Sequence, residues 1–263
     1  MLTTIQLASD LHVGEYLAEG LKVPFRIHPQ ADLLILAGDI NRGLQGMDFV
    51  RTLDVPTLYV PGVLEHAGLE PEVAAPLMKL DSLRTKVRVL QNDAAVINGI
   101  RFVGTTLWPN FGPPSLPGKP EQVGMAVAMA NYGSLQDNGK PMTYEGLWAR
   151  HQAAVAWLRQ RLAEPFDGPT AVISHHVPHP KSIPRQGAGD PFASPNETRL
   201  TELMKFADYW LHGSAHVACD YRIRDCRVIC NPVGAPSDHR HPYSVAQGSN
   251  RYDPDLLIRI SSA

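Results

Sequence analysis

The stretch DLLILAGDI, residues 32–40, indicates how this chain folds. Leu33 to Ala37 is an unbroken apolar run with the length of a strand that is buried on both faces, and the Gly38-Asp39 pair after it marks a turn. Further short apolar runs end in the same way, at polar or turn-forming residues: IQLAS (5–9) before Asp10, TLYV (57–60) before Pro61, TAVIS (170–174) before His175 and YWLH (209–212) before Gly213. The chain is therefore predicted to contain a set of buried strands, several of which end at an Asp or His side chain that could take part in catalysis or metal binding.

Helical patterns separate these strands. In residues 47–53, 71–80 and 145–164, apolar residues recur three and four positions apart, as on the buried face of a helix. Strands that alternate with helices predict an α/β sheet with crossover connections. In such sheets, ligands bind beyond the carboxyl ends of the strands, which is where the polar residues of this sequence cluster.

Two other regions have the character of antiparallel β-structure. Residues 87–108 contain the pair Asn98-Gly99, which is a strong hairpin signal, and residues 217–234 alternate around Arg224-Asp225. A layered α/β/β/α sandwich accommodates both regions, and no composition shift divides residues 1–263, so a single domain is predicted. The segments 109–142 and 178–195 are rich in Gly, Pro and Asn and are expected to form long loops over the site.

Composition and charge narrow the class of protein. The chain has 263 residues, of which 44% are hydrophobic, with a net charge of −2 and a pI of about 6.6. Nothing in this balance indicates nucleic acid or a membrane as partner, so a small-molecule substrate is expected, and the oligomeric state stays open. The N-terminal residues lack a basic leader-like region, which predicts a cytoplasmic location. Three cysteines without a CxxC pair are expected to be free thiols packed in strands.

Carboxylates and imidazoles follow the predicted strands in a regular series. Asp10 and His12 follow the first strand, Asp39 ends the next, His175-His176 ends another, and His216 comes shortly after Gly213. Taken singly, an Asp after a strand is commonly a turn or helix cap. Several of them behind separate strands form the ligand mixture that holds Zn, Mn or Fe, so the series predicts a metal site.

The same residues carry a family resemblance that covers nearly the whole chain. The segments SDLH (9–12), LAGDI (36–40), YVPGVLEH (59–66), ISHHVP (173–178), HGSAHVACDYRI (212–223) and CNPVG (230–234) resemble the calcineurin-like metallophosphoesterases. The resemblance implies a four-layer α/β/β/α sandwich and a two-metal site. It assigns Asp10, His12 and His216 to the first metal, Asp39 to the bridge and His175 to the second metal.

The departures from the family motifs all lie on one side of this site. Where the family reads G-N-H-E, this chain reads Gly62-Val63-Leu64-Glu65, so the Asn ligand is Val63 and the assisting His is Leu64. Where the family reads G-H-x-H, a second-metal His has become Ser214, followed by Ala215. Likeness to relatives that read N-P-R-G-Y places Val233 and Ala235 where an Arg and a Tyr are expected. Each change removes a polar or bulky group.

We therefore hypothesise that the second metal position has been dismantled and that one divalent ion (Zn, Mn or Fe) rather than two is retained, with Asp10, His12, Asp39 and His216 around it. Such selective loss is more typical of remodelling, by engineering or by functional divergence, than of decay. His66 and His179 are candidates for replacement ligands or acid–base groups, although surface histidines without a role are equally compatible with the sequence.

Three functions remain open from the sequence. The first is a phosphoesterase-type hydrolase in which metal-bound hydroxide attacks a phosphoester or activated ester, with Glu65, His66 or His176 replacing the lost acid. The second keeps the metal as a Lewis acid for a different reaction on a bulky apolar substrate. The third is a binding relic with impaired catalysis. In each case the substrate pocket is predicted to include a set of small or apolar residues: Val63, Leu64, Ser214, Ala215, Val233 and Ala235.

Overall fold

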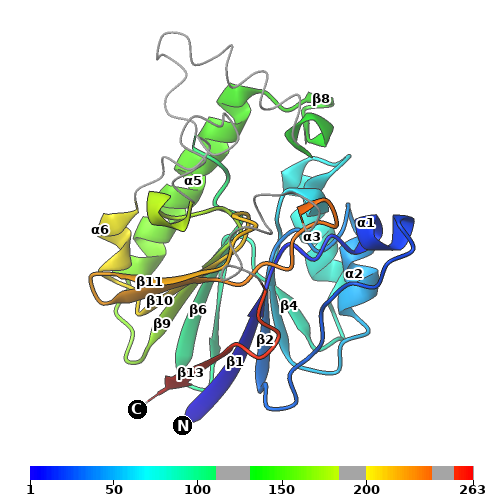
Figure 1. Cartoon of the computed structure of the whole chain (residues 1–263). Helices are drawn as coiled ribbons and strands as arrows, with labels where there is room; N and C mark the ends of the chain where they lie inside the picture. The colour runs from blue at the N-terminus through cyan, green and yellow to red at the C-terminus, as the bar shows by residue number, and fades with distance from the viewer. Residues whose placement is uncertain (111–130, 184–199, 239–251, 263) are drawn as a thin grey trace.

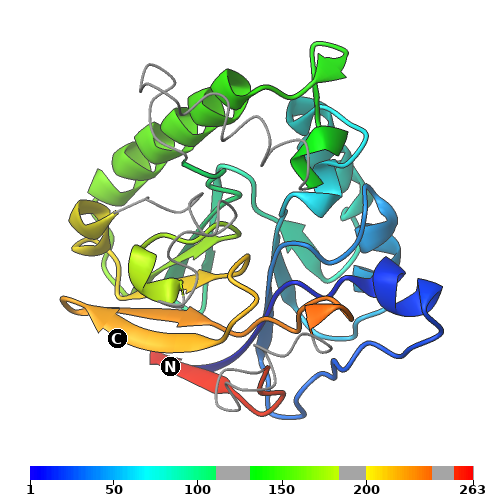
Figure 2. The ribbon, with the colours of Figure 1, turned by 45° about the horizontal axis from the view of Figure 1, so that its top comes forward.

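The computed structural model describes residues 1–110, 131–183, 200–238 and 252–262. Within them, two β-sheets pack face to face, and helices cover the outer face of each sheet (Figure 1). Figure 2, which turns the molecule, shows the two helix layers on opposite sides of the sheets. The predicted four-layer α/β/β/α sandwich is confirmed.

The first sheet runs in the order β13-β1-β2-β3-β4. Strands β1 to β4 are parallel to their neighbours, and β13 pairs with β1 in the antiparallel direction. The bounds are Leu2–Ala8 for β1, Leu33–Ala37 for β2, Thr57–Val60 for β3, Val87–Val89 for β4 and Leu257–Ser261 for β13. The apolar runs of the sequence are thus confirmed as strands, while β13 was not predicted.

The second sheet runs in the order β11-β12-β10-β9-β6-β5, with parallel strands at its centre and antiparallel strands at both edges. Its strands are β5 (Asp93–Ile97), β6 (Ile100–Thr105), β9 (Thr170–Ser174), β10 (Tyr209–His212), β11 (Cys219–Ile223) and β12 (Cys226–Cys230). Asn98 and Gly99 join β5 to β6 with φ of 51° and 72°. Two consecutive positive φ values are typical of a type I′ hairpin turn, which confirms the sequence prediction.

Helices cover both outer faces. On the first sheet lie α1 (Val13–Ala18), α2 (Gln45–Val50) and α3 (Pro71–Asp81), and on the second lie α5 (Tyr144–Ala163) and α6 (Thr201–Met204). Helices α2, α3 and α5 match predicted segments, whereas the short α1 and α6 were not predicted. Shorter elements are the 3₁₀ turns η1 (Leu64–His66), η2 (Asn131–Ser134) and η3 (Pro180–Ser182) and the strand pair β7 (Gln136–Asp137) and β8 (Lys140–Pro141). The two predicted long loops, 109–142 and 178–195, lie partly outside the described residues, which omit 111–130 and 184–195 of them.

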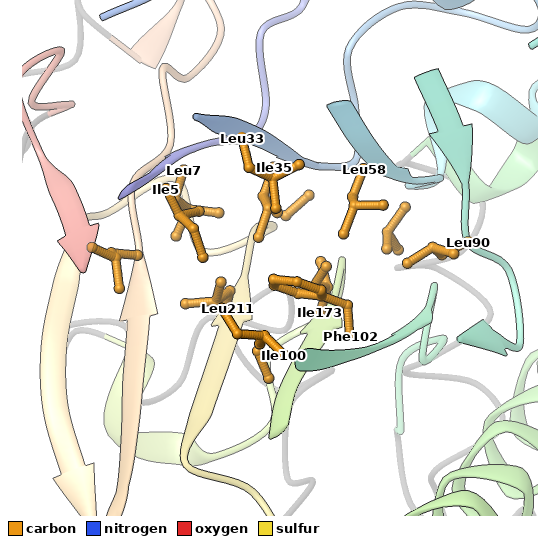
Figure 3. Close-up of a cluster of buried hydrophobic side chains, with 14 of the residues drawn as sticks. Ile5, Leu7, Leu33, Ile35, Leu58, Leu90, Ile100, Phe102, Ile173 and Leu211 are labelled. Atoms are coloured by element: carbon orange, nitrogen blue, oxygen red, sulfur yellow. The ribbon is translucent and has the colours of Figure 1, made fainter. Parts of the chain in front are cut away.

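The main core lies between the sheets. Leu7 and Ile35 of the first sheet face Phe102 and Ile173 of the second (Figure 3), and all four side chains are fully buried. Burying each such side chain stabilises the fold by roughly 1.5–3 kcal/mol. The alternate residue Leu36 packs instead against the helices outside its sheet. Both faces of the central strands are therefore buried, which explains why their sequences are unbroken apolar runs.

The parallel strands bring their carboxyl ends to one edge of the sandwich. There the two sheets are joined, because Ser9 forms a parallel bridge with Pro232 and accepts a hydrogen bond from the backbone N–H of Val233 (2.9 Å). The backbone N–H of Gly234 likewise donates to the carbonyl oxygen of Asp10 (2.9 Å). Loops from both sheets thus meet at this edge.

Candidate metal centre

Five predicted ligands meet at the joined edge in two overlapping groups. The ligand atoms of Asp10, His12 and His216 lie within 4.8 Å of one another, and so do those of Asp10, Asp39 and His175. The first group is the set that the resemblance assigns to the first metal. In the second group, Asp39, the expected bridge, lies with His175, the expected second-metal ligand, and Asp10 is common to both groups.

Strand order accounts for this arrangement. Asp10 and His12 follow β1 and Asp39 follows β2, while His175 follows β9 and His216 lies beyond β10. Each sheet therefore contributes to each group. Strand patterns alone do not specify which strands lie opposite one another, so the expected grouping came from the family resemblance.

Asp10 is fully buried and held by two donors. The Ser9 hydroxyl donates to Oδ2 (2.5 Å), and the backbone N–H of Ser214 lies 3.0 Å and 3.2 Å from the two carboxylate oxygens. Burial opposes ionisation, but the hydrogen bond and charge of His216 lower the pKa of Asp10 well below its usual range. Asp10 is thus a fixed carboxylate anion between the two groups.

Both histidines of the first group have a carboxylate behind them. His12 Nδ1 lies 2.8 Å from Glu15 Oε1, and His216 Nδ1 lies 2.6 Å from Asp238 Oδ2. Although burial disfavours their cations, Glu15 raises the pKa of His12, and Asp10 and Asp238 raise that of His216. A carboxylate that accepts the Nδ1 proton fixes the tautomer and directs Nε2 at a metal. His216 Nε2 lies 3.5 Å from Asp10 Oδ1.

The second group is held mainly by backbone. His175 Nδ1 lies 2.9 Å from the carbonyl oxygen of Ala37, which leaves Nε2 3.6 Å from Asp39 Oδ1. The same Asp39 oxygen accepts a hydrogen bond from the backbone N–H of Leu64 (2.8 Å). His175 is therefore the member of the His175-His176 pair that faces the carboxylates, as the resemblance implied.

Backbone strain is concentrated at these ligands. Four ligands have a backbone φ between 46° and 54°: Asp10, His12, Asp39 and His216. This is the left-handed region, which residues other than glycine rarely adopt. Next to them, a Cβ on Gly62 would lie 2.2 Å from Asp39 Oδ1, so only glycine fits there. The surrounding fold maintains a local geometry that is unfavourable on its own, as is common at functional sites.

The donor set fits a divalent metal ion. His12 Nε2 is buried and has no hydrogen-bond partner among the described residues, although its Nδ1 is paired with Glu15, so a lone pair is available to the group. Imidazole nitrogens with carboxylate oxygen are the ligands that Zn²⁺, Mn²⁺ and Fe²⁺ take in proteins. Three such ligands that leave a coordination position open are typical of a catalytic rather than a structural site.

Glu65, a predicted proton-transfer group, anchors the loops of the site. It is fully buried and accepts the backbone N–H groups of Asp39 (3.1 Å), Ile40 (2.6 Å) and Gly62 (2.7 Å) and the hydroxyl of Tyr59 (2.5 Å). Burial raises its pKa. With these donors on its two oxygens, Glu65 ties the end of β2 to the end of β3, and so positions Asp39.

The other candidate acid–base groups are distributed around the site. His176 is paired at both nitrogens, to the carbonyl oxygen of Thr106 (3.0 Å) and the hydroxyl of Tyr132 (2.9 Å). His66 is fully buried, and burial lowers its pKa to about 3. His179 is half-buried and accepts the backbone N–H of Lys181 (3.1 Å). Among the described residues, neither His66 nor His179 belongs to a metal-ligand group.

The predicted substrate residues do not share one apolar cluster. Val63 packs with Trp108 in a cluster beneath α5, whereas Val233 packs against the helices of the first sheet. Leu64 and Ala235 are buried as well. Ser214, whose backbone N–H donates to Asp10, and Ala215 are half-buried. A continuous apolar wall at this site therefore remains a prediction.

Three residues that support the site were not identified from the sequence. Glu15 stands three residues after His12 in α1, a spacing that brings side chains together on a helix, so this signal was present. Asp238 is far from His216 in the chain, and Tyr132 lies in a stretch rich in Gly and Asn without periodicity. No local pattern pointed to either of them.

Comparison with solved structures identifies the fold. The chain is similar to the phosphopantetheinyl hydrolase of Mycobacterium tuberculosis, with a TM-score of 0.63 and 20% identity over 97% of this chain and 96% of that one. A dimetal phosphatase from Danio rerio matches over 99% of each chain with a TM-score of 0.45 and 12% identity. No protein-family model and no curated protein matches the sequence.

The first of these similarities shows a metallophosphoesterase-type α/β sandwich, as the sequence resemblance implied. Fold and site together define a metallophosphoesterase-type sandwich with a candidate divalent-metal centre at the carboxyl edge of its strands. In the part of the chain that the structure describes, no helix is both long and apolar enough to cross a membrane.

Proposed function

We propose that this chain is a metal-dependent phosphoesterase-type hydrolase that holds one divalent ion. The observation that carries the proposal is the group of Asp10, His12 and His216, in which both imidazoles present Nε2 while a carboxylate holds Nδ1. A metal ion bound there would supply Lewis-acid chemistry, activating water and polarising a phosphoryl oxygen. The similarity to a phosphopantetheinyl hydrolase supports phosphoesters as the substrate class.

The proposal of one ion rests on the difference between the two groups. Asp10 is shared, so each group has two ligands of its own. Those of the first group are backed by Glu15 and Asp238, whereas Asp39 in the second also accepts a backbone hydrogen bond. Outer carboxylates typically contribute 10–100-fold to metal affinity. A second dication close by would also be repelled by the first.

Proton transfer to the leaving group is the step that the side chains of this site support least. Position 64, which the resemblance associates with an acid, is leucine, and Glu65 and His176 are engaged in hydrogen bonds. His66 stays neutral at neutral pH because burial lowers its pKa. General acid catalysis is typically worth about 10²–10⁴-fold, so esters with good leaving groups should be the better substrates.

A substrate panel tests the proposal. Metal-loaded protein is assayed with aryl and alkyl phosphodiesters, a phosphopantetheinyl ester, a carboxylic ester and an uncharged phosphotriester, and Asp10→Asn serves as the inactive control. Hydrolysis of the aryl phosphodiester above this control supports the proposal. Turnover of the uncharged esters alone would favour Lewis-acid chemistry on a bulky apolar substrate. Turnover of none, with metal bound, would contradict the proposal and favour a binding relic.

A further inference from the structure

Tyr132 in η2 lies beside the metal-ligand groups. Its hydroxyl is 2.9 Å from His176 Nε2, and the two rings stack with centroids 6.1 Å apart. The His176 ring in turn contacts that of His175, with centroids 4.8 Å apart. Tyr132 is half-buried, whereas both histidines are buried. Of these three residues, Tyr132 is the one that is partly exposed.

The hydrogen bonds around His176 determine what the Tyr132 hydroxyl can do. His176 Nδ1 faces the carbonyl oxygen of Thr106 (3.0 Å), which can only accept, so Nδ1 carries the proton. The other ring nitrogen, Nε2, is the hydrogen-bond partner of the Tyr132 hydroxyl. Because its hydroxyl is already paired with His176, Tyr132 is suited to contact a substrate through its ring and not to act as a general acid.

An ion-pair network holds the segment that carries Tyr132. Arg150 of α5 forms a two-pronged pair with Glu72 of α3, in which Nε and Nη2 both lie 3.0 Å from its oxygens. The same guanidinium binds Asp137 of β7 at 3.1 Å and 3.4 Å. Backbone hydrogen bonds from Gly68 to Ser134 (2.8 Å) and from Gln136 to Leu69 (3.3 Å) add to this attachment.

Aromatic side chains continue from Tyr132 into the interior. The Trp108 ring lies 6.4 Å from that of His176 and 5.1 Å from that of His66. Leu107 and Trp108 both have positive φ, 65° and 42°, and His151 Nδ1 lies 2.9 Å from each of their carbonyl oxygens. A buried imidazole thus holds a strained turn that keeps Trp108 in the stack behind Tyr132.

From this geometry we propose that Tyr132 is a specificity-determining residue that stacks on an aromatic or flat apolar leaving group of the phosphoester, and that Arg150 is its positioning residue. The inference rests on the proposed hydrolase function. It identifies the preferred substrates as aryl esters, and it assigns a purpose to the Arg150 network that spans the two helix layers.

The test compares kcat/KM for an aryl and for a methyl phosphodiester in each variant, because the ratio cancels the intrinsic reactivity of the esters. An aromatic contact of this kind is worth about 0.5–1.5 kcal/mol. Tyr132→Ala should therefore lower the aryl-to-methyl ratio about 2- to 10-fold, while Tyr132→Phe keeps it. Arg150→Lys, which retains the charge but not the fork, should lower the ratio by a smaller factor. Arg161→Lys, on the same helix and paired with Glu164, is the matched control and should leave it unchanged.

Metal content and thermal stability are measured for every variant. An unchanged ratio in Tyr132→Ala with metal bound would overturn the inference, and a lower ratio in Tyr132→Phe would show that the hydroxyl and not the ring is responsible. If Tyr132→Ala does not fold, Arg150→Lys decides in the same way. If the wild-type chain hydrolyses neither ester, the proposed function fails, and the affinity of phenyl phosphate relative to inorganic phosphate then tests the ring contact separately.

Discussion

The two sides of the metal centre share one carboxylate but are supported differently. Around His12 and His216, acidic side chains hold the outer imidazole nitrogens. Around Asp39 and His175, the partners are backbone groups of Ala37 and Leu64. Both sides keep a left-handed backbone at a ligand. The two sides therefore share a backbone geometry but differ in the groups that support their ligands, and we expect the side with carboxylates behind its imidazoles to bind a metal more strongly.

The largest effect is expected from Asp10→Asn, because Asp10 is the residue common to both groups. A neutral amide removes the charge that attracts an ion on either side, so bound metal and hydrolysis should both fall to background. Elemental analysis and a phosphodiester assay measure this, with Asp220→Asn, a surface partner of Arg227, as the control. A variant that keeps its full metal content would show that the two sides are independent.

The next largest effect is expected from rebuilding the second side. The triple variant Val63→Asn, Leu64→His and Ser214→His should bind a second ion and gain about 10²–10⁴-fold on esters with poor leaving groups through the restored acid. Leu64→His alone is the control for the acid without the ion. If the triple variant still binds one ion per chain, the account of the missing ligands is wrong.

Weakening the first side should have a moderate effect. Glu15→Gln and Asp238→Asn leave the ligands in place but remove the carboxylates behind them, so metal affinity should fall about 10–100-fold in each. Competition with a chelator measures this affinity, and Asp32→Asn, an exposed carboxylate that accepts a backbone N–H of Thr4, is the matched control. Equal affinity in all of these variants would contradict the distinction between the two sides.

The substitution His66→Phe should have the smallest effect on activity, but it should change how the stability of the protein depends on pH. Burial lowers its pKa from 6.5 to about 3, so between these values the unfolded chain binds a proton that the folded chain does not. The stability that this neutral ring permits is thus present above pH 6.5 and is lost as the pH falls toward 3. Between pH 7.5 and 4.5, metal-free wild-type protein should lose about 2–3 kcal/mol more than His66→Phe. Urea unfolding at both values checks this, and equal losses would mean that His66 is not buried as a neutral ring.

The sequence predicts the scaffold well because the scaffold depends on local patterns. Apolar runs such as Leu33–Ala37 specify strands that are buried on both faces, and Asn98-Gly99 specifies a hairpin. Each predicted ligand follows such a strand, so all of them meet at one edge. Strand β13 was missed, since its pairing with β1 is a contact between the two ends of the chain.

What the sequence cannot predict depends on contacts that are distant in the chain. That Asp10 is common to both ligand groups follows from which strands lie opposite each other across the sandwich. Glu65 is indistinguishable in the sequence from a proton donor, and only the donors around it show that it anchors a loop. The segment that carries Tyr132 is held at the site by the ion pairs of Arg150, which join α3, β7 and α5.

The central claim, that the site holds one ion, is tested most directly by counting metal. Protein purified in buffer supplemented with trace Zn²⁺, Mn²⁺ and Fe²⁺ is dialysed and analysed for metal per chain, together with His12→Ala and His175→Ala. The account predicts about one equivalent in the wild-type chain, nearly none in His12→Ala and about one in His175→Ala. About two equivalents in the wild-type chain, with one remaining in each variant, would show that both groups bind an ion and would contradict the claim.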